Sequence, residues 1–458
     1  MAPSIVILAA GKGSRMGASI PKALQKIANK PMLLHLLDTL KIIKNKQIII
    51  VVGYQHELIR ASCKDYAVEF AMQDPQHGTG HAARCAMPLV KSEQVLVLNA
   101  DMPLISAQTF ASLLQALEDN DCVMLTNVVE EPTGLGRIMR NEHGVITKII
   151  EQADATGHEL AIKEINAGIY GFNVKLLNKY LQLLENNNKQ HELYLTDVIS
   201  LAAKDNIKIV AVHPHESLET CGANSFYELA LLEKKYQLSG IKKLQDNGVH
   251  VIDPQRLDLR GDLQIAADVT LDVNVVFEGA CIVEEFVEIG PNCYIKNSTI
   301  KKYAKILPNS IIEDSVIGQE CVIGPFARIR PGSILSDKVK IGNFVEIKKS
   351  SIDQRTKINH LSYIGDATIG KNVNIGAGVI TCNYDGANKY QTIIEDEVFV
   401  GSNTEIIAPL KISVKATIAA GTTLLNDVPA NALVLSKKVQ TTIANWLRPI
   451  KKNKDGEV

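Results

Sequence analysis

The chain has 458 residues, with 49 Lys and Arg against 50 Asp and Glu, and a formal net charge of −1. This length predicts two or three domains, and the near-zero charge gives no electrostatic reason to expect nucleic acid or a membrane as partner. The eight cysteines form no C-x-x-C pair, so we expect buried thiols in a reducing cytoplasm, without disulfides or a zinc site. No apolar stretch is long enough for a transmembrane span, and we expect no signal peptide.

The first half of the chain alternates buried strands with helical segments. We expect strands at Ser4–Ala9, Gln47–Val52, Gln94–Asn99 and Cys122–Val128, and helices at Met32–Leu40, Thr79–Pro88 and Ala107–Asp119. This alternation predicts a mostly parallel sheet with helices on both faces. Such sheets bind ligands beyond the carboxyl ends of their strands.

A glycine-rich loop from Leu8 to Gly17 follows the first strand. Its glycines let backbone N–H groups approach a phosphate, and Lys12, Arg15 and the later Lys22 add positive charge. The spacing of the glycines fits neither a Walker A motif nor the dinucleotide-binding fingerprint. By itself the loop therefore indicates only a general phosphate site.

Asp101 follows directly on the strand Gln94–Asn99 and so lies at a carboxyl edge of the predicted sheet. One carboxylate completed by substrate phosphates and water is a usual Mg²⁺ site. The alternative is a turn-capping aspartate before Pro103.

The pattern changes near Asn224. Residues 226–245 have helical spacing, and a six-residue repeat begins after Asp253-Pro254. We therefore predict a first domain over residues 1–226, a linker helix over 227–249 and a second domain over 250–458 that includes a C-terminal tail.

The second domain is organised by an aliphatic residue that returns every six positions. The clearest run is Val400, Ile406, Ile412, Ile418 and Leu424. This period fits neither a lone strand nor a helix and is typical of a parallel β-helix, in which three hexads form one triangular coil. We expect Asn292, Asn309, Asn343 and Asn372 at the corners, where positive φ is required. A spacer or trimerisation module without chemistry is the alternative to a catalytic β-helix.

Two features of the repeat favour chemistry. A polar insertion, Thr381 to Tyr390, interrupts the hexads between Ile375 and Ile393, and loops on rigid scaffolds commonly carry function. His360 is the only histidine after His250, and a neutral imidazole suits a general base. A structural role for this lone histidine is the alternative.

The ordered motifs resemble one enzyme family over nearly the whole chain. They are Leu8-Ala9-Ala10-Gly11 with Arg15, Pro21-Lys22, Gln73, Gly78-Thr79, the strand-end Asp101, Gly136, Glu151, Asn166, Asn224, the hexads with His360, and Asn383-Tyr384-Asp385-Gly386. The chain is similar to the bacterial bifunctional N-acetylglucosamine-1-phosphate uridyltransferase/glucosamine-1-phosphate acetyltransferases. The resemblance implies a Rossmann-like α/β nucleotidyltransferase domain followed by a left-handed parallel β-helix.

The resemblance implies two reactions. Glucosamine-1-phosphate would first be acetylated by acetyl-CoA, and the product would then attack UTP to give UDP-N-acetylglucosamine and pyrophosphate. This product supplies peptidoglycan, lipopolysaccharide and lipid A precursors. A cytoplasmic homotrimer that requires Mg²⁺ and binds neither nucleic acid nor membrane is implied as well.

The resemblance also implies roles for individual residues. The nucleotide and sugar would be bound by Leu8, Ala9, Ala10, Gly11, Lys22, Gln73, Gly78, Thr79, Asn99, Asp101, Gly136, Glu151, Asn166 and Asn224. Asp101 and Asn224 would ligate Mg²⁺, and Arg15 and Lys22 would be catalytic cations. His360 would be the base of acetyl transfer. Glucosamine phosphate would be bound by Arg330, Lys348, Tyr363 and Asn374, and acetyl-CoA by Ala377, Asn383, Tyr384, Ser402, Ala420 and Lys437.

Two positions depart from the family pattern. Ala100 replaces the usual glycine before the metal-binding aspartate, and Lys437 replaces an arginine, which keeps the charge but loses the planar fork. Two other functions remain as alternatives at this stage: a nucleotidyltransferase with a single activity and a structural β-helix, and a non-enzymatic assembly subunit.

Overall fold

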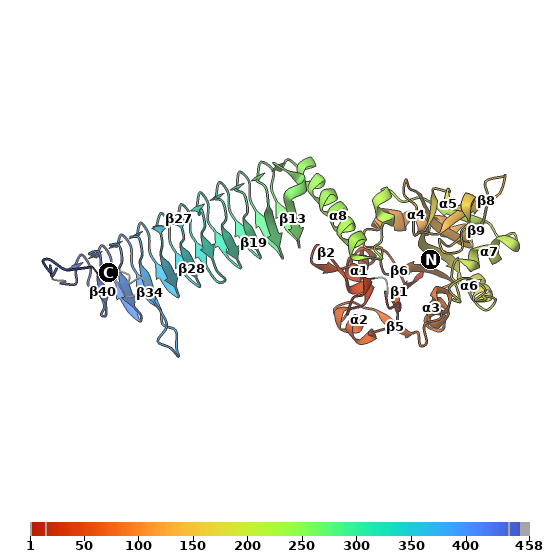
Figure 1. The fold of residues 1–458 in the computed structure, drawn as a ribbon, viewed down its shortest axis with the longest axis horizontal. Helices are drawn as coiled ribbons and strands as arrows, with labels where there is room; N and C mark the ends of the chain where they lie inside the picture. Colours follow the sequence, from red (N-terminus) through yellow and green to blue (C-terminus); the bar gives the residue numbers. More distant parts are fainter. Residues whose placement is uncertain (1, 14–15, 438–439, 449–458) are drawn as a thin grey trace, which may run out of the picture. The chain divides into compact units, whose positions relative to one another are not determined.

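The computed structural model of the chain describes residues 2–13, 16–437 and 440–448 and divides into two compact units (Figure 1). The first unit comprises residues 1–243 with 259–261, and the second comprises residues 244–258 with 262–458. Helix α8 (Phe226–Asp246) precedes β12 (His250–Val251), the first strand of the repeat. The domain boundaries predicted at residues 226 and 249 would separate parts of the chain that fold independently, and they stay predictions.

The first unit is built on a nine-stranded mixed sheet whose main path is β11-β7-β10-β6-β1-β4-β5. The strands are β1 (Ser4–Leu8), β4 (Gln47–Val52), β5 (Glu69–Met72), β6 (Gln94–Asn99), β7 (Cys122–Val128), β8 (Arg137–Arg140), β9 (Ile146–Ile150), β10 (Glu164–Asn173) and β11 (Ile209–Val212). Strand β10 runs antiparallel to β6 and β7, whereas β6, β1, β4 and β5 are parallel to one another. The main path is mostly parallel as predicted, but the prediction missed the long antiparallel strand β10.

Helices cover both faces of this sheet. Those packed on it are α1 (Met32–Ile42), α2 (His56–Ser62), α3 (Thr79–Ala86), α4 (Ala107–Glu118), α6 (Val174–Leu181) and α7 (Asp197–Lys204), and the short helix α5 (Gly157–Leu160) has no buried residue. Successive residues of β1 enter opposite cores, because side chains alternate across a strand. Ile5 packs with Leu36 of α1 and Phe110 of α4, and Val6 packs with Leu177 of α6 and Val198 of α7. The predicted third helix ends at Ala86, where a 3₁₀ turn containing Pro88 follows.

The carboxyl ends of three strands meet at one edge of the sheet. Leu8 of β1 lies between Val51 of β4 and Asn99 of β6. The pairing continues into the loops, where Ala9 N donates to Val51 O (2.9 Å) and Ala100 N donates to Leu8 O (3.2 Å). The glycine-rich loop and the segment carrying Asp101 therefore leave the sheet side by side. Short elements complete this unit: β2 (Lys26–Ile27), β3 (Lys30–Pro31), and 3₁₀ turns at Lys22–Leu24, Met87–Leu89 and Ser217–Thr220.

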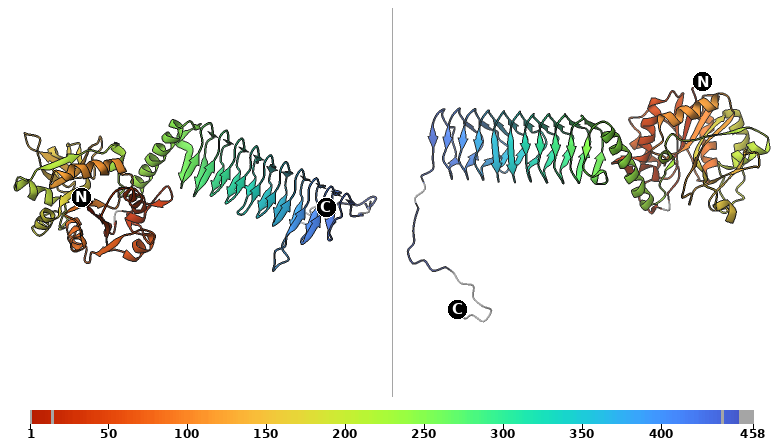
Figure 2. Two further views of the ribbon diagram at one scale, coloured as in Figure 1. Left: turned by 180° about the vertical axis from the view of Figure 1, so that it is seen from behind. Right: turned by 90° about the horizontal axis from the view of Figure 1, so that it is seen from above.

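The second unit is a parallel β-helix of three sheets, in which every third strand belongs to the same sheet (Figure 2). The first sheet contains β12, β15 (Thr270–Leu271), β18 (Glu288–Ile289), β21 (Lys305–Ile306), β24 (Val322–Ile323), β27 (Lys340–Asn343), β30 (Lys357–His360), β33 (Asn374–Ile375), β36 (Phe399–Val400), β39 (Thr417–Ile418) and β41 (Leu433–Val434). The second sheet contains β13 (Leu257–Arg260), β16 (Val275–Glu278), β19 (Tyr294–Lys296), β22 (Ile311–Glu313), β25 (Arg328–Ile329), β28 (Glu346–Lys348), β31 (Tyr363–Gly365), β34 (Ile380–Cys382), β37 (Glu405–Ile407) and β40 (Thr423–Leu424). The third sheet contains β14 (Leu263–Ile265), β17 (Cys281–Val283), β20 (Thr299–Ile300), β23 (Val316–Ile317), β26 (Ile334–Leu335), β29 (Ser351–Ile352), β32 (Ala367–Ile369), β35 (Thr392–Ile394) and β38 (Leu410–Ile412).

The corners between sheets are made by residues with positive φ. Asn292 (φ 59°), Asn309 (φ 61°) and Asn372 (φ 53°) occupy such corners, in agreement with the sequence analysis. The prediction for Asn343 was wrong, because this residue ends strand β27 and the corner is made by Phe344 (φ 55°). A one-residue error of this kind arises because successive coils differ in length, as in the pairs Lys305↔Val322 and Val322↔Lys340, so the hexad spacing alone does not fix the corner.

The predicted insertion leaves the stack after β34. Asn374 pairs with Phe399 in the next coil, whereas Lys357 pairs with Asn374 only 17 residues later. The extra residues form a hairpin loop that projects beside β34 (Figures 1 and 2). Asp385 stabilises its tip, because its Oδ1 accepts from the backbone N–H groups of Ala387 (2.7 Å) and Asn388 (2.6 Å).

Buried aliphatic side chains fill the interior of the coils, and cysteines share that space. The thiols of Cys281, Cys293 and Cys321 donate to the carbonyls of Ile295 (3.6 Å), Leu307 (3.3 Å) and Ser336 (3.1 Å). Burial raises the pKa of Cys293 to about 11 and that of Cys321 to about 12. These thiols therefore stay protonated at neutral pH.

Among the described residues, no helix combines the length and the apolar character that crossing a membrane requires.

Candidate active sites

Lys22, Asp101 and Asn224 meet at the carboxyl edge of the first sheet. The ammonium of Lys22 forms an ion pair with Oδ2 of Asp101 and lies 2.7 Å from Oδ1 of Asn224. Two oxygen atoms from distant parts of the chain thus converge on one cationic position. Carboxylate and amide oxygens are ligands that Mg²⁺ accepts, and it commonly completes its shell with phosphates and water.

Local structure brings these side chains together. Asp101 is delivered by the end of β6, and a Cβ added to Gly222 would lie 3.0 Å from the carbonyl oxygen of Asp101. A small residue at this position lets the chain approach Asp101 closely. Asn224 is fixed in turn by the start of α8, because its backbone N–H donates to the carboxylate of Glu228 (2.6 Å).

The predicted uridine-binding residues surround the same edge. Gln73 is buried, and its amide donates to the carbonyl of Gly78 (2.9 Å). Gly78 has φ 105°, and a Cβ there would lie 2.6 Å from the carbonyl oxygen of Leu193, so only glycine fits. The hydroxyl of Thr79 accepts from the N–H of Leu195 (3.0 Å). Gly78 and Thr79 are therefore both held against residues 193–195.

Three predicted sugar-binding residues also meet. A Cβ added to Gly136 would lie 3.4 Å from Oε2 of Glu151 and 3.6 Å from Cβ of Asn166. Burial raises the pKa of Glu151, and the carboxylates of Asp154 and Asp197 raise it further, although the hydroxyl of Thr196 opposes this shift. A carboxyl group with a raised pKa between small and amide side chains is suited to hydroxyl and amide groups of a sugar.

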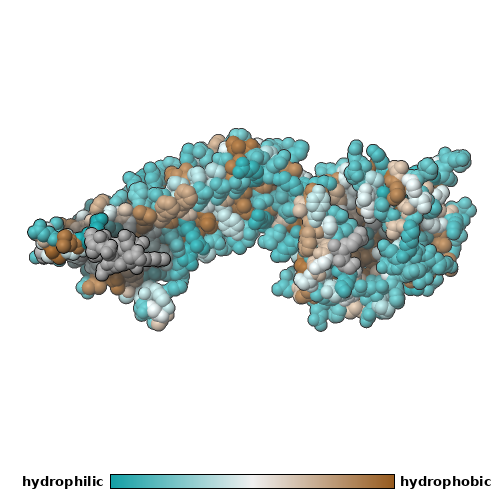
Figure 3. All heavy atoms as spheres, viewed as in Figure 1, coloured by the Kyte–Doolittle hydropathy of each residue, from teal (hydrophilic) through white to brown (hydrophobic). Residues whose placement is uncertain are grey.

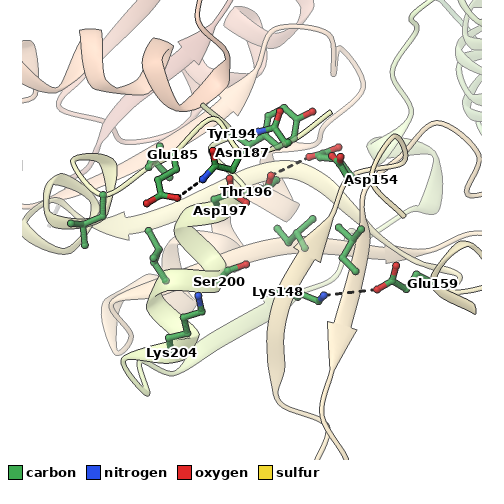
Figure 4. A pocket seen from close by; sticks show the side chains of 17 residues that line it. Lys148, Asp154, Glu159, Glu185, Asn187, Tyr194, Thr196, Asp197, Ser200 and Lys204 are labelled. Carbon is green, nitrogen blue, oxygen red and sulfur yellow. Dashed lines mark hydrogen bonds and ion pairs between the residues drawn. The ribbon is translucent and has the colours of Figure 1, made fainter. Parts of the chain in front are cut away.

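A hollow of about 510 Å³ lies between β9 and α7, lined in part by Glu151, Tyr194 and Asp197 (Figure 4). It contains none of the predicted nucleotide-binding residues on β1 or β6, and its outer wall carries the Lys148–Glu159 ion pair (3.8 Å). The hollow therefore reaches Glu151, one of the predicted sugar-binding residues, from one side. Its lining includes none of Lys22, Asp101 and Asn224, which form the Lys22 cluster.

The remaining predicted residues of this unit differ in their placement. The amide of Asn99 fits against Gly168, where a Cβ would lie 2.4 Å from Nδ2. Ala100 is buried and does not adopt positive φ, so alanine is accommodated where the family usually has glycine. Arg15 lies outside the described residues.

In the β-helix, His360 belongs to a column of residues that each directly precede a corner. Backbone hydrogen bonds link the column: Leu361 N donates to Asn343 O (3.1 Å), Gly378 N to His360 O (3.3 Å), Asn403 N to Ala377 O (2.8 Å) and Gly421 N to Ser402 O (2.7 Å). The members are thus Asn343, His360, Ala377, Ser402 and, one coil further, Ala420. The predicted base and three predicted acetyl-CoA residues therefore lie in one line, and beyond His360 all the side chains of the line are small.

A polar cluster lies on the second sheet of the β-helix. The ammonium of Lys348 donates to Oδ2 of Asp366 (3.0 Å), and the amide of Asn383 donates to the same oxygen (2.5 Å). Burial opposes ionisation of Asp366, but Lys348 and Asn383 outweigh it and lower the pKa of this carboxyl group. In return, the hydrogen bond to Asp366 raises the pKa of Lys348. Nearby, the guanidinium of Arg330 donates to Glu346 (2.6 Å).

Sequence reasoning missed these acidic partners. Asp366 and Glu346 each lie one coil from a predicted cation, but that relation appears only after the coil length is known. It also missed Lys389 in the inserted loop, whose pKa is lowered by the neighbouring ammonium of Lys348. Asp366 is therefore part of the polar cluster, although nothing in the sequence distinguished it from other carboxylates.

The other predicted residues of the acetyl site are not all brought together. Tyr363 lies on β31 in the same sheet as Lys348, whereas Asn374 lies on β33 in another sheet. Tyr384 is exposed in the loop, and Lys437 is exposed after β41. Asn383 is buried and its amide is engaged by Asp366.

Comparison with known proteins assigns the whole chain. A MobA-like NTP transferase domain matches residues 5–168, and the C-terminal domain of GMPPB matches residues 259–352. The bifunctional protein GlmU of Azoarcus sp. (strain BH72) is 45% identical over 448 residues, which cover 98% of this chain and 99% of that protein. GlmU of Janthinobacterium sp. (strain Marseille) is 46% identical over 449 residues, again covering 98% and 99%. The chain belongs to the GlmU family.

Membership of the GlmU family confirms three predictions: the family itself, the pairing of an α/β nucleotidyltransferase domain with a left-handed parallel β-helix, and an enzyme with uridyltransferase and acetyltransferase activities. The two alternatives, a single-activity enzyme and an assembly subunit, do not account for the similarity of the entire chain to GlmU proteins. A solved structure, that of UDP-glucose pyrophosphorylase complexed with UDP-glucose, is similar over 53% of this chain and 100% of its own, at 21% identity and with a TM-score of 0.43.

Proposed function

We propose that the chain makes UDP-N-acetylglucosamine in two steps at two sites, with His360 as the base of acetyl transfer and the Lys22 cluster at the centre of uridylyl transfer. The observation that supports this proposal most strongly is the column of His360, Ala377, Ser402 and Ala420, in which an imidazole stands at one end of a row of small side chains. The substrates are small molecules: glucosamine-1-phosphate, acetyl-CoA and UTP.

In acetyl transfer, the neutral amine of glucosamine-1-phosphate attacks, and the imidazole of His360 takes the proton that the nitrogen loses as it attacks. The amine nitrogen bonds to the thioester carbonyl carbon, the carbon–sulfur bond breaks, and the thiolate of coenzyme A leaves. Arg330 and Lys348 would hold the sugar phosphate with Tyr363 and Asn374. Their carboxylate partners, Glu346 and Asp366, keep both cations in fixed positions.

In uridylyl transfer, a phosphate oxygen of N-acetylglucosamine-1-phosphate attacks the α-phosphorus of UTP, and the bond to pyrophosphate breaks. Such transfers depend on positioning and charge neutralisation more than on a protein nucleophile. Lys22 supplies positive charge, the loop from Leu8 to Gly11 supplies backbone N–H groups, and Glu151 with Asn166 orients the sugar.

The residues present fit a Mg²⁺ ion. Asp101 and Asn224 already direct their oxygens toward one cationic position, which the ammonium of Lys22 marks. They would hold the ion as protein ligands, and Mg²⁺ supplies charge neutralisation on phosphate oxygens when bound. Lys22 would then be free to contact the phosphates.

The proposal includes a homotrimer in the cytoplasm. Asn374 lies in a different sheet from Lys348 and Tyr363, and we propose that a second copy of the chain brings residues of both sheets into one site. Phe326, Phe344 and Leu361 are 49%, 57% and 63% exposed in successive coils, and apolar side chains interrupt the polar surface along the β-helix (Figure 3). Exposed apolar surface of this kind is typical of an interface.

The test is His360→Ala with both activities measured on one preparation. Loss of a general base typically costs about 10²–10⁴ in rate, so thiol release from acetyl-CoA should fall by that factor. Pyrophosphate release from UTP and supplied N-acetylglucosamine-1-phosphate should be unchanged. The matched control is His250→Ala, which removes an exposed histidine from the same sheet. Undiminished acetyl transfer in His360→Ala would remove His360 from the mechanism.

A further inference from the structure

The ladder between β27 and β30, the strand that ends at His360, is longer than the other ladders of its sheet. Strands β27 and β30 each have four residues, whereas the other described strands of that sheet have two. The extension pairs Asn343 with His360 at the ends of the two strands. At this level of the stack, the ladder therefore continues to the corner and places two polar side chains in register.

Close backbone packing fixes that register. A Cβ added to Gly342 would lie 2.0 Å from the carbonyl oxygen of Asn359, so a larger residue would separate the two strands just before Asn343 and His360. Phe344 (φ 55°) and Leu361 (φ 49°) turn the chain immediately afterwards. Asn343 and His360 are thus held between a tight contact and a corner, which leaves their backbones little freedom.

The two side chains are joined by one hydrogen bond. Nδ1 of His360 lies 3.1 Å from Oδ1 of Asn343. An amide oxygen only accepts hydrogen bonds, so this contact requires the imidazole proton on Nδ1. In the neutral imidazole the other nitrogen, Nε2, then keeps its lone pair. The carbonyl of His360 is anchored as well, since it accepts from the hydroxyl of Ser362 (2.8 Å) and the N–H of Gly378 (3.3 Å).

We infer that Asn343 is a positioning residue for acetyl transfer: it holds His360 in the tautomer whose Nε2 accepts the proton of the attacking amine. The inference rests on the proposed role of His360 as the base. In this role Asn343 acts through His360 and not on the substrate. An asparagine serves this role without placing a negative charge beside the imidazole.

The test compares Asn343→Ala, Asn343→Asp and the double variant with His360→Ala in the full-length chain. Asn343→Ala should lower kcat of acetyl transfer by roughly tenfold, the size of one neutral hydrogen bond, with KM for glucosamine-1-phosphate within about twofold. The double variant should be no slower than His360→Ala, because residues that act as a unit are not additive.

Asn343→Asp adds a readout that a purely structural role would not change. Aspartate still accepts from Nδ1 but adds a negative charge, so the acid limb of the acetyl-transfer profile should move up by about one pH unit. The charged groups on the neighbouring strands are Lys340 of β27, Lys357 of β30 and, on the adjacent sheet, Arg328 of β25, the Arg330–Glu346 pair and the Lys348–Asp366 pair; residues 374–378 of the next coil contain none. All of these are unchanged in the variant, so the shift reports the new carboxylate.

The matched control is Asn292→Ala, which removes an asparagine amide from the same edge of the β-helix, where it donates to Asn309 (3.2 Å). Uridylyl transfer of each variant checks the fold. The inference is overturned if Asn343→Ala acetylates at the normal rate, if Asn292→Ala is equally slow, if the profile of Asn343→Asp does not move, or if the double variant is a further tenfold slower than His360→Ala. Full acetyl transfer in His360→Ala would instead overturn the proposed function itself.

Discussion

Replacement of Asp101 by asparagine tests the centre of the uridyltransferase site. Asp101 is the one carboxylate in the cluster with Lys22 and Asn224, and the substitution removes its charge while keeping its size. Asparagine retains an oxygen for Lys22, so the surrounding chain should keep its conformation. The variant thus separates the charge of Asp101 from its role as a turn residue after β6.

The size of the effect follows from the contacts. The side chains of Lys22 and Asp101 are 17% and 25% exposed, so solvent screens their ion pair only in part. A hydrogen bond to a charged group contributes about 1.5–3 kcal/mol, or roughly 10- to 150-fold in a rate constant. Because Asp101 is also the proposed anionic ligand for Mg²⁺, we expect kcat/KM for uridylyl transfer to fall by about 10²–10³.

The assay is pyrophosphate release from UTP and N-acetylglucosamine-1-phosphate over a titration of Mg²⁺. The Mg²⁺ concentration for half-maximal rate should rise in Asp101→Asn, while acetyl transfer stays within about twofold of wild type. Asp119→Asn, at the exposed end of α4, is the control for removal of an aspartate charge from the same domain. A normal rate with a normal Mg²⁺ dependence in Asp101→Asn would show that this residue only caps a turn.

Three further predictions concern separability, assembly and pH. A fragment of residues 1–226 should retain uridylyl transfer and lack acetyl transfer, and a fragment with the opposite pattern would reverse the assignment of the sites. Light scattering should give three times the mass of one chain, and an active monomer would contradict the proposed trimer. Burial raises the pKa of Glu151, so its ionisation at neutral pH opposes folding. Glu151→Gln should therefore melt above wild type at pH 8, with a difference that disappears below the ordinary pKa of glutamate, and should bind N-acetylglucosamine-1-phosphate more weakly.

Local patterns were sufficient where burial determines structure. The bounds predicted for β4, β6 and β7 agree with the structure, because each is a mostly apolar segment buried on both faces. Strand β10 was not predicted, because its position depends on antiparallel pairing with β6 and β7 rather than on its own composition. The hexads predicted the coils of the second unit but did not fix their length.

The candidate sites were likewise predicted only as far as local motifs reach. Lys22, Asp101 and Asn224 were selected by motif, and their convergence required the sheet edge and the close approach at Gly222. Asp366 and Asn343 were missed, because each acts on a residue one coil away. A shift of one residue in coil length would separate both pairs, and no local pattern in the sequence specifies it.

The buried cysteines of the β-helix can report which coils open first when the domain unfolds. In a stack where each coil contacts only its neighbours, opening starts most easily at an end and proceeds coil by coil. Cys281, Cys293 and Cys321 lie in successive regions of the interior, protonated and shielded from solvent. A thiol reagent modifies such a group only after its own coil has opened. The order in which the three react therefore shows from which direction the stack unravels.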